Sequence, residues 1–168
     1  MATALAVIAF GLSAAQGPAP SDATYGPLWN YNGTWQITKS GAAKPDVLLN
    51  QCALVGKYFA CQQSVNGAVS ALLVFVPSGT PGQFHTQSVM PDGRGAGLGM
   101  LKVEGDKWTF LSNWNQGGST TYYKTTNVFT GKTRIHFEQQ ESSDNKDWKT
   151  TGSGDEVRTS AGRMTVAR

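Results

Sequence analysis

Charged side chains are scarce in this chain. Asp, Glu, Lys and Arg make up 15% of the 168 residues, whereas roughly a quarter is usual for globular proteins. The formal net charge is +3, and the basic residues are scattered along the chain, which argues against a nucleic-acid partner. Glycine and uncharged polar residues supply the polarity instead, a composition that fits an exported β protein.

Long apolar stretches are also lacking, and beyond the first residues no stretch is long enough to span a bilayer. Residues 1–12 form an uncharged apolar run, and the small-x-small pattern of residues 13–15 could be cleaved before Gln16. We therefore predict a signal peptide over residues 1–15 and a secreted or periplasmic location. A buried N-terminal helix is the alternative, and the two prolines of residues 17–20 disfavour it.

Catalytic and metal-binding signatures are absent as well. The chain has no Gly-x-Ser-x-Gly elbow and no His-Glu-x-x-His motif. The glycine-rich stretch 94–99 is not followed by a helical pattern, which a dinucleotide-binding fingerprint requires. The plausible strand acids, Glu138 and Glu141, differ in parity, so they would point to opposite faces of a regular strand. We predict no cofactor and no metal site, and we leave open whether the protein is an enzyme.

Cysteine is limited to Cys52 and Cys61. They lie in two predicted strands, 48–55 and 58–65, joined by Gly56-Lys57, a two-residue loop suited to a type II′ turn. That register places Cys52 directly opposite Cys61, at a non-hydrogen-bonded position where Cα atoms approach most closely. We predict a cross-strand disulfide. Two free thiols, or half of a metal site, are the alternatives.

Short alternating segments separated by turn residues dominate the rest of the chain. Asn66-Gly67 is a strong signal for a type I′ hairpin. The predicted strands cover residues 34–39, 48–55, 58–65, 69–76, 83–90, 94–103, 107–114, 120–129, 132–141 and 148–158. They predict an all-β, antiparallel up-and-down meander of about ten strands, which removes its edges best by closing into a barrel. A twisted sandwich is the alternative. The domain would cover residues 32–160, after an extended lead-in over 16–31 and before a basic tail over 161–168.

Gly33-x-Trp35 at the first strand, the meander, and Arg158 near the last strand together resemble the calycin superfamily, the lipocalin-like barrels. The chain looks closer to the lipocalin-like domains of secreted bacterial proteins than to classical lipocalins. The resemblance implies that Trp35 forms the barrel floor, with Arg158 lying over its ring in a cation–π contact. Both residues would then be structural. The chain departs from lipocalins in having no predicted helix before its final strand.

A barrel of this kind suggests a binding function. We expect an exported barrel that binds a small, mostly apolar or aromatic ligand, with a lining of mixed polarity. The residues we expect to line the cavity are His85, Gln87, Trp108, Trp114 and Tyr122.

Two other functions remain open. One is a cofactor-free isomerase, cyclase or lyase that uses His85 or His136 as a general acid or base. The other is an interaction domain with a filled core. On the strand around His136, Arg134 and Glu138 share its face, which favours a solvated outer surface for that residue. The oligomeric state and the identity of the ligand are not predicted.

Overall fold

The computed structural model describes residues 22–95, 97–163 and 165–167. The predicted signal peptide and the first part of the lead-in lie outside these residues. The signal peptide therefore stays a prediction.

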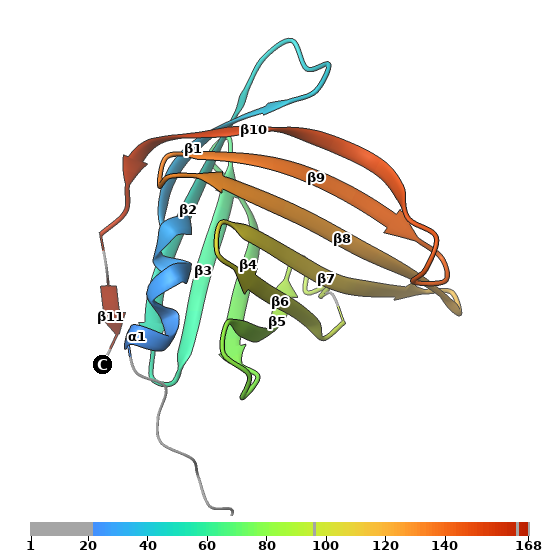
Figure 1. Cartoon of the computed structure of the whole chain (residues 1–168), viewed down its shortest axis with the longest axis horizontal. Coiled ribbons are helices and arrows are strands. Elements are labelled where there is room, and N and C mark those ends of the chain that lie inside the picture. The colour runs from blue at the N-terminus through green and yellow to red at the C-terminus, as the bar shows by residue number, and fades with distance from the viewer. Residues whose placement is uncertain (1–21, 96, 164, 168) are drawn as a thin grey trace, which may run out of the picture.

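Ten antiparallel strands form a closed up-and-down barrel (Figure 1). They are β1 (Gly33–Lys39), β2 (Asp46–Val55), β3 (Tyr58–Val65), β4 (Ala68–Pro77), β5 (Gln83–Val89), β6 (Gly99–Glu104), β7 (Lys107–Gln116), β8 (Ser119–Thr130), β9 (Arg134–Ser142) and β10 (Lys149–Ala161). The barrel closes because β1 pairs with β10 along one edge and with β2 along the other. The predicted all-β meander is confirmed, and the barrel is consistent with a calycin-like fold.

The turn chemistry sets the hairpin registers. Between β3 and β4, Asn66 and Gly67 have φ values of 51° and 84°, as a type I′ turn requires. Between β2 and β3, Gly56 has a φ of 59°, and Cys52 lies opposite Cys61. The two cysteines form a disulfide with a Cα–Cα distance of 4.0 Å. The predicted hairpin and its bridge are both confirmed.

The lead-in is helical in its described part, where an extended segment was expected. It consists of α1 (Asp22–Tyr25) and the 3₁₀ helix η1 (Gly26–Tyr31). Pro27 suits the first turn of a helix, where its missing N–H has no intrahelical partner to lose. The segment folds into one end of the barrel and fully buries Tyr25 and Leu28. The Tyr25 ring stacks on Phe59 and Phe84, with centroids 5.7 and 5.9 Å away.

Two further boundaries differ from the prediction. The strand expected over residues 94–103 is reduced to β6, which begins at Gly99. A Cβ atom at Gly97 would collide with the Asn113 side chain, so this stretch approaches β7 too closely for regular alternation. The basic tail contains a strand that was not predicted, β11 (Thr165–Ala167), which pairs in parallel with β2.

Candidate functional site

A cavity of about 290 Å³ occupies the barrel interior beyond the helical segment. It is lined by Tyr31, Leu48, Asn50, Cys61, Gln63, Leu73, Phe75, Phe110, Thr125, Asn127, Gln139 and Glu156. Gln139, on β9, lines the cavity and is also exposed to solvent. It therefore lies at the mouth of the cavity. Apolar and polar side chains share the lining, so the cavity differs from the aromatic core at the other end.

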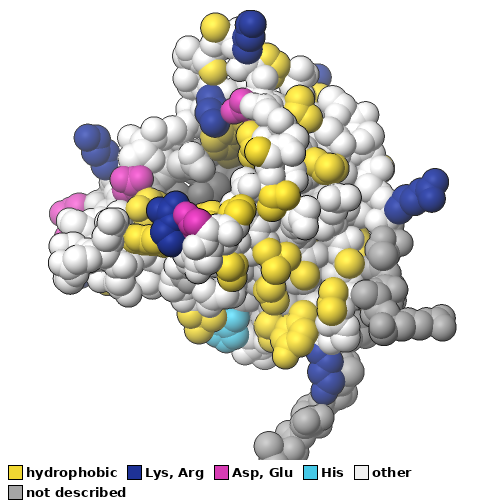
Figure 2. Space-filling view, turned by 180° about the vertical axis from the view of Figure 1, so that it is seen from behind, with side chains coloured by type: hydrophobic (Ala, Val, Ile, Leu, Met, Phe, Trp, Pro, Cys, Tyr) yellow, Lys and Arg dark blue, Asp and Glu magenta, His cyan; other side chains and the backbone are white. Residues whose placement is uncertain are grey.

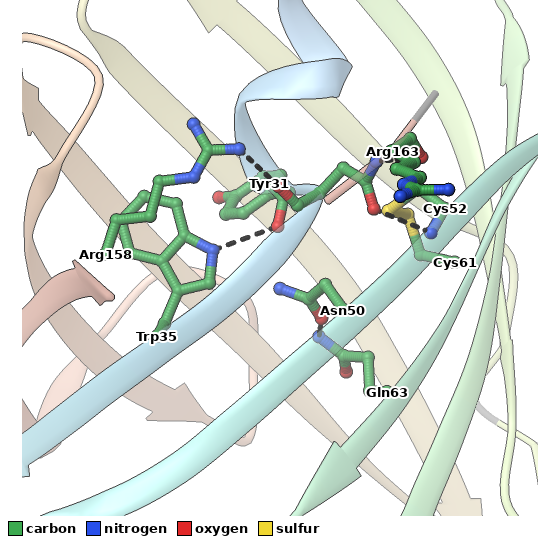
Figure 3. Close-up of a disulfide and its surroundings, with 9 residues drawn as sticks. Tyr31, Trp35, Asn50, Cys52, Cys61, Gln63, Arg158 and Arg163 are labelled. Carbon is green, nitrogen blue, oxygen red and sulfur yellow. Dashed lines mark hydrogen bonds between the residues drawn. A yellow bond between two sulfur atoms is a disulfide. The ribbon is translucent and has the colours of Figure 1, made fainter. Parts of the chain in front are cut away.

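Strand alternation explains why polar groups face inward here. On β2, the buried positions are Leu48, Asn50, Cys52 and Leu54, so Asn50 occupies an inward place in an otherwise apolar series. Gln63 Nε2 donates a hydrogen bond to Asn50 Oδ1 over 2.9 Å (Figure 3). Asn50 Nδ2 is buried and has no hydrogen-bond partner. The amide therefore presents a free donor inside the barrel.

Tyr31 and Asn127 form a second polar pair. Tyr31 is the last residue of η1, and Asn127 lies on β8 with the inward parity of Phe129. The Asn127 side-chain amide donates a hydrogen bond to the Tyr31 hydroxyl. Burial raises the pKa of Tyr31, which keeps its hydroxyl neutral. Asn127 Oδ1 is buried without a partner, so this pair presents a free acceptor.

Glu156 is the charged member of the lining. It lies on β10 between Ile37 of β1 and Ile135 of β9, and only 9% of its surface is exposed. Its Oε2 atom has no hydrogen-bond partner. Desolvation raises the pKa of this carboxyl to about 7 because burial disfavours the ionised form. Near neutral pH the residue is therefore poised between its two protonation states.

The closed end of the barrel holds Trp35 and Arg158, which are opposite one another on β1 and β10. The Arg158 guanidinium lies 5.4 Å from the Trp35 ring centroid, and Trp35 Nε1 donates to the Tyr31 carbonyl over 3.0 Å. Arg158 also donates a hydrogen bond to the Asn32 carbonyl, and Figure 3 shows the Arg158 side chain beside Trp35. Trp35 is fully buried. These contacts attach the helical segment to the strands that close the barrel.

The residues that the sequence predicted to line a ligand cavity do not come together in the interior cavity. On β5 the buried Phe84 takes the inward parity, so His85 faces outward. Gln87 is exposed and lines a separate small cavity of about 110 Å³. His85 lies opposite Val76 on β4 and Met100 on β6. Trp108 is buried in the packed core against Phe129, with centroids 4.6 Å apart.

Trp114 and Tyr122 also lie outside the interior cavity. Trp114 is partly exposed, and the Arg94 guanidinium lies 5.9 Å from its ring centroid. Tyr122 shares a groove on the outer wall with His85. Figure 2 shows that hydrophobic side chains are spread over the outer surface of the molecule too. Apolar character alone therefore does not mark the inner wall.

His136 lies on the outer face of β9. Its Nδ1 atom is 2.9 Å from Asp155 Oδ1, and both side chains are largely exposed. This position agrees with the expectation that the strand face of His136 is a solvated outer surface. Neither histidine contributes to the interior cavity, so the geometry does not favour an interior histidine acid or base.

Sequence reasoning missed Tyr31, Asn50, Asn127 and Glu156. A usable signal existed for Glu156, because it has the same parity on β10 as Arg158, which the resemblance placed over the barrel floor. Asn127 similarly has the parity of Phe129. Tyr31 gave no such signal, since its position depends on the helical segment entering the barrel.

A scan against protein-family models, a search of curated proteins and a search of solved structures each found no match for this chain. Within the described part of the chain, no helix has the length and apolar character needed to cross a membrane. Across the same residues, no group of three or more His, Cys, Asp or Glu side chains could hold a metal ion.

Proposed function

We propose that the protein binds a small molecule with an apolar body and a few polar groups inside the barrel. The observation that carries the proposal is the set of three buried polar atoms without partners, on Asn50, Asn127 and Glu156, all in the lining of one cavity. Buried polar groups are normally hydrogen-bonded to protein or to ordered water. A ligand that bonded to these three atoms would take the place of water there and would be oriented by them.

The remaining lining supports an apolar or aromatic body for the ligand. Leu48, Leu73, Phe75 and Phe110 contribute carbon surface to the cavity, and burying apolar area is the main source of affinity in such sites. The volume of about 290 Å³ is near the lower end for ligand pockets, which start at roughly 300 Å³. The cavity therefore suits a small molecule better than a long lipid chain.

The proposal includes an extracellular or periplasmic setting. The disulfide between Cys52 and Cys61 supports it, since such bridges persist mainly in oxidising compartments. The bridge also lies beside the cavity, because Cys61 is one of its lining residues. It would brace the β2–β3 hairpin that carries Asn50 and Gln63.

A matched pair of tryptophan substitutions tests the proposal. Thr125 lines the cavity, whereas its neighbour Thr126 lies in a groove on the outer wall. A library of small polar aromatic fragments is screened by ligand-observed NMR against the wild type, Thr125→Trp and Thr126→Trp. We expect hits that Thr125→Trp abolishes and Thr126→Trp retains. Hits equally unaffected by both substitutions would refute binding inside the barrel.

A further inference from the structure

We propose that the ligand carries a positive charge, as an organic amine whose ammonium group pairs with the Glu156 carboxylate. The inference rests on the proposed function, since it assigns the chemical class of the molecule in the same cavity. Among the described residues that line the cavity, Glu156 is the only one whose side chain can carry a charge near neutral pH. Any net charge that the lining offers a ligand is therefore negative.

Among the described residues, no lysine or arginine forms an ion pair with this carboxylate. The residues opposite it, Ile37 on β1 and Ile135 on β9, are apolar. Arg158 faces inward two residues further along β10, but its guanidinium lies over Trp35 and donates to the Asn32 carbonyl. From η1, Tyr31 contributes only a neutral hydroxyl. Burying an ionised carboxylate without a partner is costly, and an ammonium group on the ligand removes that cost.

The other free atoms of the cavity suit an ammonium group as well. An ammonium presents two or three N–H donors, and the lining offers unpartnered acceptors on both Glu156 and Asn127. Tyr31 and Phe110 add aromatic rings to the same lining, and aromatic faces attract cations. The free Nδ2 group of Asn50 would donate a hydrogen bond to a hydroxyl or ether oxygen elsewhere on the molecule.

An organic cation fits this site better than a metal ion. Hard divalent cations such as Ca²⁺ take roughly six to eight oxygen ligands, often from several carboxylates. The described lining supplies one carboxylate and a few amide oxygens. A single ammonium needs only two or three acceptors, and the cavity offers two unpartnered ones, on Asn127 and Glu156.

Matched pairs of amines and alcohols test the assignment. The probes are phenethylamine with 2-phenylethanol and butylamine with 1-butanol, titrated by calorimetry at pH 8 into the wild type and Glu156→Gln. We expect each amine to bind the wild type roughly tenfold or more tightly than its alcohol, the equivalent of one ion pair. In Glu156→Gln the preference should vanish while alcohol binding is retained, which also shows that the variant is folded.

A pH series adds a second readout. In the wild type, amine affinity should fall roughly tenfold per pH unit below 7, because ammonium binding requires the ionised carboxylate. Glu156→Gln should show no such dependence. If the alcohols bind as tightly as the amines, or if Glu156→Gln keeps the preference, the charge assignment is wrong and binding in the cavity stands. If no probe binds and the fragment screen is also negative, the proposed function itself is overturned.

Discussion

The buried carboxyl of Glu156 leads to a quantitative prediction about stability. Desolvation raises its pKa from 4.5 to about 7, so the folded protein either holds a proton or buries a charge. At ~1.4 kcal/mol for each pKa unit, this rise costs about 3 kcal/mol of folding free energy once the group is ionised in both states. The residue is 9% exposed, so solvent screening reduces this figure only modestly.

The sign of the pH dependence follows from the direction of this pKa change. Below about pH 4.5 the carboxyl is protonated in both the folded and the unfolded chain, so the folded protein keeps its full stability. Between about pH 4.5 and 7 the unfolded chain releases its proton first, so stability falls as pH rises. Above the folded pKa of about 7 the loss is complete. Glu156→Gln removes the titrating group while nearly preserving its shape.

Urea unfolding, followed by tryptophan fluorescence at pH 4, 5.5, 7 and 8.5, measures the effect. We expect the free energy of unfolding of Glu156→Gln, minus that of the wild type, to increase by about 3 kcal/mol from pH 4 to pH 8.5. Glu138→Gln, on the outer wall, is the control for removing one negative charge. A difference for Glu156→Gln that stays constant with pH would refute the desolvated carboxyl.

Two further predictions concern the frame around the cavity. Replacing Cys52 and Cys61 together by alanine removes the bridge across a separation of 9 residues and should cost roughly 2–3 kcal/mol of unfolding free energy. Urea unfolding checks this, with reduced wild type as the control, and a loss below about 0.5 kcal/mol would contradict it. Arg158→Gln removes the cation over Trp35 and should lower stability by about 2 kcal/mol. Arg158→Lys should restore only part of the lost stability, since lysine lacks the planar guanidinium. The indole N–H signal of Trp35 in NMR should shift in both variants. Full recovery of stability in Arg158→Lys would contradict the stacking geometry.

Much of the wall was predictable from local sequence because its determinants are local. The dipeptides Gly56-Lys57 and Asn66-Gly67 fix two-residue loops, and each loop fixes the register of the strands that flank it. The pairing of Cys52 with Cys61 followed from the strand register that the Gly56-Lys57 loop sets. The meander closes because short hairpin connections keep successive strands adjacent, and closure removes the exposed edges.

The inner and outer faces were harder to assign because the alternation of polar and apolar residues fails where both faces carry apolar side chains. On β4, Phe75 is buried while Leu72, of opposite parity, is 44% exposed. Register shifts between Gln63 and Ser64, and again between Thr150 and Gly152, then change the parity partway along a strand. His85 was accordingly expected inside, where the structure places Phe84.

By itself, then, the sequence determined the all-β class, the strand order, the principal hairpins and the disulfide. These depend on turn residues and on spacing along the chain. Only the tertiary structure decided what the barrel encloses. The segment ending at Tyr31 fills one end of the barrel and leaves a cavity at the other, and Glu156 becomes a buried carboxylate only when β10 is placed between β1 and β9. Burial and the absence of a countercharge are properties of neighbours far apart in sequence, so no local pattern could reveal them.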